Sequence, residues 1–190
     1  IKIGDSETMF TCHLDTATSK FEKVKHVFEN NLIKTDGTTI LGADDKAGTA
    51  VMLYMMANNV PGIYYFFIGE ERGGIGSHQV AGVFDTVEHL KGMKRCVSFD
   101  RRNYYSIITH QLGRQCCSEQ FAQSLAGELN KSGLSIALDS TGVYTDSAVN
   151  CLTQALNLTI IPYSTTLSLK VFLDGYFQYG SNPASMVAAR

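Results

Sequence analysis

The sequence predicts an α/β fold with a mixed, mostly parallel, doubly wound sheet and helices on both faces. Apolar, β-rich runs alternate with helical patterns along most of the chain. Several of these runs end directly in histidine or acidic residues, as expected at the carboxyl edge of an open α/β sheet, where functional sites lie. The 190 residues contain no Pro-, Ser- or charge-rich linker. We therefore expect a single domain over residues 1–190.

The first half of the chain supplies two strands, a hairpin and a helix. "TMFTCHLD" (8–15) predicts a strand, and 26–42 predict a hairpin with its turn at Asp36-Gly37. "KAGTAVMLYMMANN" (46–59) has the length and composition of a buried helix, ended by Pro61-Gly62. The aromatic run "GIYYFFIG" that follows predicts a central strand covered on both faces.

The second half continues the same alternation. Helices are expected over residues 77–84, 86–92 and 118–133, and strands over 95–100, 104–111 and 134–138. Ser118 is placed to cap the longest of these helices, and Gly133 to end it.

Composition excludes several function classes. Hydrophobic residues make up 44% of the chain and charged residues 18%, which is typical of a globular protein. The formal net charge is -2 and no basic block occurs, which disfavours nucleic acid and anionic membranes as partners. The longest apolar stretches are far short of a membrane span.

The cysteines indicate a reducing compartment. Their number is odd, and none has CxxC spacing; they are Cys12, Cys96, Cys116, Cys117 and Cys151. This pattern favours free thiols over a disulfide scaffold or a cysteine-based zinc site. No charged leader with an apolar core opens the sequence. We therefore expect a cytoplasmic protein.

Acidic residues and one histidine follow the apolar runs. They are His13, Asp15, Asp44, Asp45, Glu70, Glu71 and Asp100. Each motif alone also fits an ordinary strand end, a solvated turn or the acidic start of a helix. Their joint occurrence, each after an apolar run, indicates one rim with hard ligands for a divalent cation such as zinc, manganese or cobalt.

The order of these motifs resembles that of the co-catalytic zinc exopeptidases of peptidase clan MH. That group includes peptidase T-like tripeptidases, related deacylases and single-domain zinc aminopeptidases. The matching motifs are "HLDTA" (13–17), "LGADDKAG" (41–48), "GEERGGIGS" (69–77), "SFD" (98–100) and "TGVYTDS" (141–147). They cover roughly residues 8 to 150 and leave no gap long enough for a lid or dimerisation domain, so the chain looks like a catalytic domain alone.

The resemblance implies a role for each residue of the first metal site. His13 resembles the ligand of the first metal, and Asp15 the acid that holds the imidazole of His13 from behind. Asp44 resembles the carboxylate that bridges two metals. Asp100 resembles the remaining ligand of the first metal.

The two adjacent glutamates resemble a ligand and a base. Glu71 looks like the ligand of the second metal, and Glu70 like the general base that acts on a metal-activated water. Because neighbouring residues of an extended chain point to opposite sides, one carboxylate could bind metal while the other faces the water.

The last motif lies on a loop that borders the substrate in relatives. Thr145 and Asp146 are its candidate substrate-binding residues. The alternative is an ordinary turn in which Asp146 caps the short helix that follows.

The chain departs from the family near its C-terminus. Relatives supply a second histidine there, whereas the last histidine here is His110, and Thr165 and Thr166 stand near the expected position. Residues 162–190 diverge from the family. Three explanations remain open: a single metal, a substitute ligand such as His110 or a neighbouring subunit, or an altered gene end.

The leading hypothesis is therefore a zinc-dependent exopeptidase, an aminopeptidase or tripeptidase, with one or two metal ions and a short peptide as substrate. An acylated amino acid is the alternative substrate, for a deacylase. The competing hypothesis is a non-catalytic or impaired relative that keeps the fold and at most one metal. If the chain forms a homo-oligomer, we expect contact through the sheet edge or the hairpin.

Overall fold

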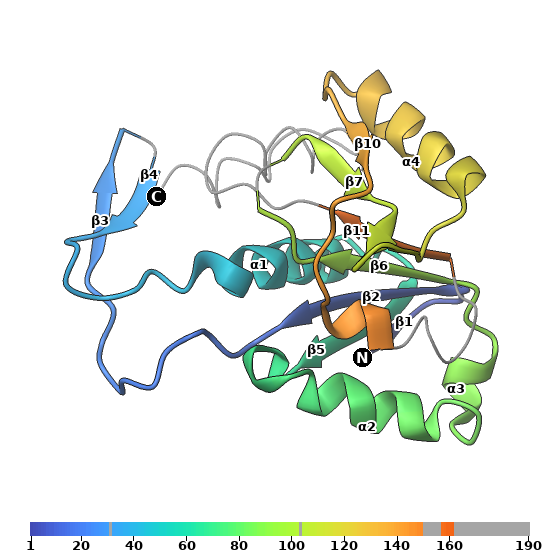
Figure 1. The fold of residues 1–190 in the computed structure, drawn as a ribbon, viewed down its shortest axis with the longest axis horizontal. Helices are drawn as coiled ribbons and strands as arrows, with labels where there is room; N and C mark the ends of the chain where they lie inside the picture. The colour runs from blue at the N-terminus through green and yellow to red at the C-terminus, as the bar shows by residue number, and fades with distance from the viewer. Residues whose placement is uncertain (31, 103, 150–156, 162–190) are drawn as a thin grey trace.

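The chain is built around one seven-stranded sheet. The computed structural model describes residues 1–30, 32–102, 104–149 and 157–161, the last range through its backbone. The strand order is β1-β5-β2-β6-β11-β7-β10 (Figure 1). These strands are β1 (Lys2–Ile3), β2 (Thr8–His13), β5 (Gly62–Phe67), β6 (Arg95–Phe99), β7 (Ser106–Ile108), β10 (Ala137–Asp139) and β11 (Asn157–Ile161).

The sheet is mixed and mostly parallel, as predicted. β5, β2, β6 and β11 run parallel to one another. β1 joins β5 antiparallel at one edge, and β7 joins β11 antiparallel near the other. β7 and β10 form a further parallel pair.

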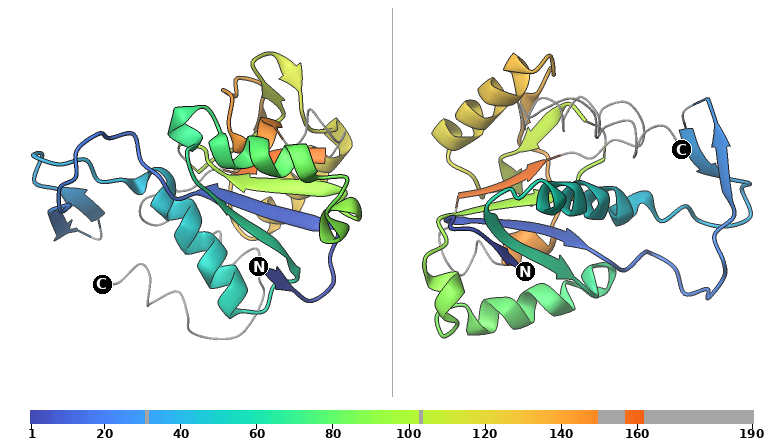
Figure 2. Two further views of the ribbon diagram at one scale, coloured as in Figure 1. Left: turned by 90° about the horizontal axis from the view of Figure 1, so that it is seen from below. Right: turned by 180° about the vertical axis from the view of Figure 1, so that it is seen from behind.

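Helices cover both faces of the sheet (Figure 2). They are α1 (Ala43–Ala57), α2 (Ile75–Val83), α3 (Glu88–Lys91) and α4 (Glu119–Lys131). Because successive strand residues point to opposite faces, Phe10 packs in the core with α1 and α4, and Met9 in the core with α2 and α3. No helix in the described part of the chain is long and apolar enough to cross a bilayer.

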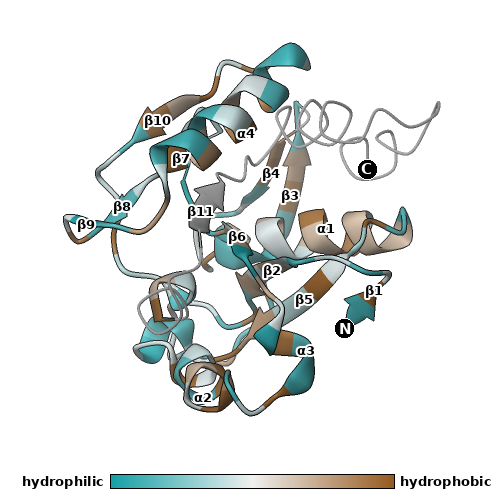
Figure 3. Ribbon diagram, turned by 90° about the vertical axis from the view of Figure 1, so that its right-hand side faces the viewer, coloured by the Kyte–Doolittle hydropathy of each residue, from teal (hydrophilic) through white to brown (hydrophobic). Residues whose placement is uncertain are grey.

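The two long helices form where the sequence predicts them. Residues Val51, Met52 and Met55 of α1 pack in the same core as Tyr64 of β5, and Figure 3 shows hydrophobic residues on both elements. In α4, the Ser118 side chain accepts a hydrogen bond from the backbone N–H of Phe121, which confirms the predicted cap.

The hairpin of β3 (His26–Glu29) and β4 (Leu32–Thr35) projects away from the main sheet (Figure 1). Its predicted turn at Asp36-Gly37 is wrong, because Glu29 pairs with Leu32 and the chain reverses between them. Asn30 lies there with a φ of 49°, a left-handed conformation that asparagine tolerates better than most residues. Asp36 and Gly37 instead lie in the connection that leads towards α1.

Two further strand predictions need correction. Residues 104–111 form two short strands, because β7 belongs to the main sheet while β8 (His110–Gln111) pairs with β9 (Arg114–Gln115). β10 begins later than the strand predicted over 134–138, because the backbone N–H of Ile136 donates to the side chain of Asn130 and not to a neighbouring strand. β11 was not predicted as a strand, although it lies beside β6 in the middle of the sheet.

β5 is covered on both faces, as predicted, but it is not a central strand. Its Ile63 and Tyr64 belong to the two opposite cores. Only the two-residue β1 lies between β5 and the sheet edge. β2, with β5 on one side and β6 on the other, is the strand on which the site is centred.

Candidate metal centre

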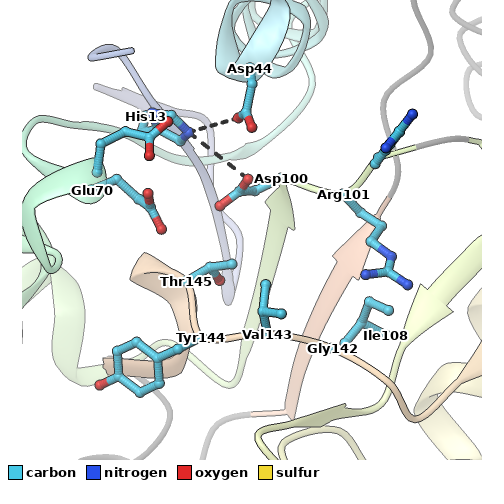
Figure 4. Close-up of a pocket in the computed structure, with 12 residues that line it drawn as sticks. His13, Asp44, Glu70, Asp100, Arg101, Ile108, Gly142, Val143, Tyr144 and Thr145 are labelled. Carbon is cyan, nitrogen blue, oxygen red and sulfur yellow. Dashed lines mark hydrogen bonds and ion pairs between the residues drawn. The ribbon is translucent and has the colours of Figure 1, made fainter. Parts of the chain in front are cut away.

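The sequence-predicted residues meet at the carboxyl ends of β5, β2 and β6. His13 is the last residue of β2, and Asp100 directly follows β6. Glu70 and Glu71 follow β5, and Asp44 lies in the first turn of α1. Because the three strands are parallel neighbours, their ends share one rim. Figure 4 shows the labelled His13, Asp44, Glu70 and Asp100 converging on the same cavity.

His13 is oriented by a backbone carbonyl and faces two carboxylates. Its Nδ1 lies 3.0 Å from the carbonyl oxygen of Asp15, which can only accept, so Nδ1 carries hydrogen and donates. Its Nε2 lies 3.0 Å from Asp44 Oδ1 and 4.0 Å from Asp100 Oδ1. The tautomer fixed in this way leaves Nε2 as the nitrogen available to a metal when the ring is neutral.

The surrounding acids determine the charge of His13. Burial alone would lower its pKa, but the hydrogen bond that His13 donates to Asp44 and the charges of Asp100 and Asp45 outweigh this and raise the pKa to about 10. Burial raises the pKa of Asp100 to about 8; His13 opposes this shift, while Glu70 and Asp44 add to it. Without metal, His13 therefore carries a proton that a cation would have to displace.

Asp15 contacts both His13 and the turn that carries the glutamates, and the sequence predicted only the first of these contacts. Its Oδ1 lies 3.6 Å from His13 Nδ1, behind the imidazole. Its two oxygens also accept hydrogen bonds from the backbone N–H groups of Glu70 and Glu71, each at 3.2 Å. Burial would raise the pKa of Asp15, but these amide bonds lower it below the usual range. Asp15 therefore connects His13 to the turn that carries both glutamates.

The glutamates lie in the 3₁₀ turn η1 (Glu70–Arg72), not in an extended chain. The prediction that they point to opposite sides is therefore wrong, because successive residues of a 3₁₀ helix are separated by about 120° around its axis. Gly69 enters the turn with a φ of 75°, which glycine adopts without strain. His13, Glu70 and Glu71 nevertheless each offer a ligand atom within 4.8 Å of the others.

Asp45 holds the backbone of His13 in place, a role that sequence reasoning missed. Its Oδ2 accepts from the backbone N–H of His13 at 3.2 Å, and its Oδ1 from that of Gly48 at 3.0 Å. The residue is fully buried. A Cβ on Gly48 would lie 2.4 Å from both Asp45 Oδ1 and the carbonyl oxygen of Phe99. The glycine three residues after the acidic pair was the sequence signal for this close approach.

The cavity next to these residues has a volume of about 340 Å³. Thr145 lines it, while its Oγ1 lies 2.8 Å from Ser147 Oγ and its N–H donates to Gln111 Oε1. Asp146 does not line the cavity; it is buried and accepts a hydrogen bond from Ser77 Oγ at 2.5 Å. The two predicted substrate-binding residues therefore differ, since only Thr145 borders the space where a ligand would lie.

The second histidine ligand has no counterpart in the described part of the cavity. His110 does not line the cavity, and its Nδ1 lies 3.0 Å from Thr109 Oγ1. Thr165 and Thr166 lie outside the described residues. One imidazole with several carboxylates remains a donor set suited to zinc, manganese or cobalt.

Comparison with curated proteins finds short, clear similarities. No family model matches the chain. Seventy-five residues are 49% identical to the uncharacterized protein YqjE of Bacillus subtilis (strain 168), covering 36% of this chain and 20% of that protein. Fifty-four residues are 41% identical to peptidase T of Aliivibrio salmonicida, covering 28% of this chain and 13% of that protein. The chain thus spans a fifth or less of these relatives' length.

Solved structures share the fold over most of the chain. A tripeptidase from Staphylococcus aureus superimposes with a TM-score of 0.62 and 16% identity, covering 90% of this chain and 78% of that one. The TET1 peptidase of Pyrococcus horikoshii gives a TM-score of 0.54 and 17% identity, covering 74% of this chain and 44% of that one. The predicted fold class is confirmed: the chain has the fold of these peptidases.

Proposed function

We propose that this chain is the catalytic part of a metal-dependent exopeptidase that hydrolyses short peptides. The observation that carries the proposal is the orientation of His13, whose Nε2 faces Asp44 and Asp100 at the carboxyl end of the sheet. The short matches to peptidase T and the fold shared with a tripeptidase support the same function.

The donor set divides into two metal positions. His13, Asp44 and Asp100 would hold the first cation, and Asp44 with Glu71 the second. Zinc is the proposed metal, with manganese or cobalt as alternatives, because imidazole and carboxylate ligands suit all three. When bound, such a cation supplies positive charge that lowers the pKa of water and polarises a substrate carbonyl.

Glu70 is the proposed general base. Burial raises its pKa to about 7; His13 opposes this shift, and the charges of Asp146, Glu71 and Asp44 add to it. A carboxylate with a pKa near neutrality can accept a proton from the attacking water and return it to the leaving amine. Asp15 would hold this base in place through the backbone N–H groups of the turn.

Two alternatives accompany this proposal, and one of them follows from a specific observation. The described lining of the cavity contains a single histidine, which favours a relative with one metal and little or no activity. An N-acyl amino acid deacylase would use the same ligands and the same base. Both alternatives are outcomes of the experiment below.

The proposal includes the setting of the enzyme. We assign residues 1–190 to one catalytic domain and place it in the cytoplasm, which is supported by the free state of the four described cysteines, Cys12, Cys96, Cys116 and Cys117. The exposed side chain of Phe28 on the projecting hairpin supports homo-oligomer contact through that hairpin.

The test compares hydrolysis of aminoacyl and N-acyl model amides by zinc-loaded protein and its Glu70→Gln variant. A general base contributes about 10²–10⁴-fold to the rate, so the variant should lose at least about 100-fold in kcat. Equal rates in both proteins would refute the role of Glu70. Inactivity of the metal-loaded protein towards both substrate types would favour the non-catalytic alternative.

A further inference from the structure

The cavity has a cationic side that the proposed chemistry does not use. Arg101 and Arg102 line the same cavity as His13, Asp44 and Glu70. Both arginines directly follow Asp100 at the end of β6. Figure 4 shows Arg101 reaching towards Ile108 and Gly142, on the side of the cavity away from Glu70. The cavity therefore has opposite charges on two sides.

Arg101 is occupied within the protein. Its Nη2 donates to Asp139 Oδ2 at 2.7 Å, and lies 3.5 Å from Thr141 Oγ1. Burial would raise the pKa of Asp139, but hydrogen bonds from Thr141 and the charge of Arg101 hold it below the usual range. The ion pair joins the segment after β6 to the end of β10. Arg101 therefore shapes the cavity wall, and its charge is balanced by Asp139.

Arg102 is not occupied in this way. Its side chain is exposed, and it forms no ion pair or side-chain hydrogen bond with another residue in the described ranges. A guanidinium presents a planar fork of N–H donors that matches a carboxylate through two parallel hydrogen bonds. Arg102 is thus a cation at the cavity that an anionic ligand can engage without breaking an existing ion pair.

We propose that Arg102 binds the C-terminal carboxylate of the substrate, an inference that rests on the proposed function. Asp100 and Arg102 are two residues apart, so their Cα atoms lie at most about 7 Å from each other. A carboxylate held at Arg102 therefore lies within a few residues of an amide held at His13, Asp44 and Asp100. The substrate class is a short chain whose free carboxylate is close to the scissile bond.

The wall between the two charged sides is apolar. Ile108, Val143 and Tyr144 line it, and the side chains of Val143 and Tyr144 are exposed. An apolar substrate side chain can pack there while its carboxylate reaches Arg102. Short peptides and N-acyl amino acids share this chemistry, whereas an aminopeptidase that reads only the free amine has no use for Arg102.

Binding to metal-free protein tests the carboxylate site without requiring activity. The probes are the tripeptide Leu-Gly-Gly and its C-terminal amide, with N-acetyl-leucine and its amide as a second pair, measured by NMR titration. Arg102→Gln removes the charge, and Arg114→Gln is the matched control because Arg114 is exposed in β9 and does not line the cavity. Arg102→Lys tests whether charge alone suffices.

Wild type and Arg114→Gln should bind the free acids about tenfold or more tightly than the amides, and Arg102→Gln should lose most of this preference. In zinc-loaded protein Arg102→Gln should raise KM for the acid, whereas KM for the amide, which offers no carboxylate to Arg102, should change far less. Tighter binding of Leu-Gly-Gly would identify a peptide as the substrate, and tighter binding of N-acetyl-leucine would identify an N-acyl amino acid. Equal binding of acid and amide to wild type, no binding of either, or an unchanged preference in Arg102→Gln would overturn the inference. Acid preference without hydrolysis would leave the carboxylate site standing and refute only the proposed function.

Discussion

The two sides of the metal centre are built in different ways. On the His13 side, the buried carboxylate of Asp45 accepts hydrogen bonds from two backbone N–H groups, one at the end of β2 and one in α1. On the glutamate side, Glu71 is exposed on a three-residue turn, and Asp15 holds that turn through its backbone. Core packing thus determines the position of His13, the proposed ligand of the first metal. The short turn η1, anchored by the carboxylate of Asp15, determines the position of Glu70 and Glu71.

The largest expected effect comes from the packing beneath His13. Gly48→Ala should lower the free energy of unfolding of the metal-free protein by about 1–3 kcal/mol, because the new Cβ meets the carbonyl oxygen of Phe99 and the carboxylate of Asp45. Urea denaturation measures the change. The same substitution should weaken metal binding, since Asp45 holds the backbone of His13.

Gly127→Ala is the matched control for this prediction. Gly127 lies inside α4, and a Cβ there would meet nothing within 4 Å. The variant should be about 1 kcal/mol more stable, because alanine favours a helix more than glycine does. If both variants changed stability in the same direction, the close approach at Gly48 would not be a constraint.

Linkage to pH gives the next largest effect. In metal-free protein the neighbouring acids raise the pKa of His13 to about 10, so its imidazole carries a proton at neutral pH. His13 must lose this proton to bind a cation, so metal affinity should rise about tenfold per pH unit between about pH 6 and pH 8. Calorimetric titration in two buffers with different ionisation enthalpies measures the released protons. Affinity independent of pH would contradict the proposed ligands.

The strand ends were predictable from sequence because a buried strand appears as a largely apolar run that stops at an ionisable residue. Three apolar runs that end in a histidine or an acid became strands that deliver these residues to the rim, as β2 and β6 do with His13 and Asp100. Parallel neighbours then bring these residues together. The resemblance to known peptidases added the roles that we propose for them.

The contacts made by backbone groups were not predictable. The hydrogen bonds that the η1 amides donate to Asp15, and that the His13 amide donates to Asp45, depend on local φ and ψ angles, which residue types do not specify. The hairpin turn was misassigned for a related reason: Asn30 adopts the left-handed conformation that Asp36-Gly37 also favours, and strand register decided between them.

The smallest effect on metal binding is expected on the glutamate side. Glu71→Gln should leave the affinity of the tighter metal within about threefold of wild type, because an exposed side chain that does not contact the first position contributes little to it. Competition with a chromogenic chelator measures this affinity. A loss of all bound metal in this variant would show that the two sides do not act separately.

Metal content tests directly whether His13 is the key ligand of the proposed metal centre. The measurement is zinc per chain by elemental mass spectrometry, after loading and dialysis, for wild type and His13→Ala. We expect at least one zinc per chain in wild type and its loss in the variant, while far-UV circular dichroism shows that the variant is folded. Absence of zinc from wild type, or equal zinc in both proteins, would contradict the account.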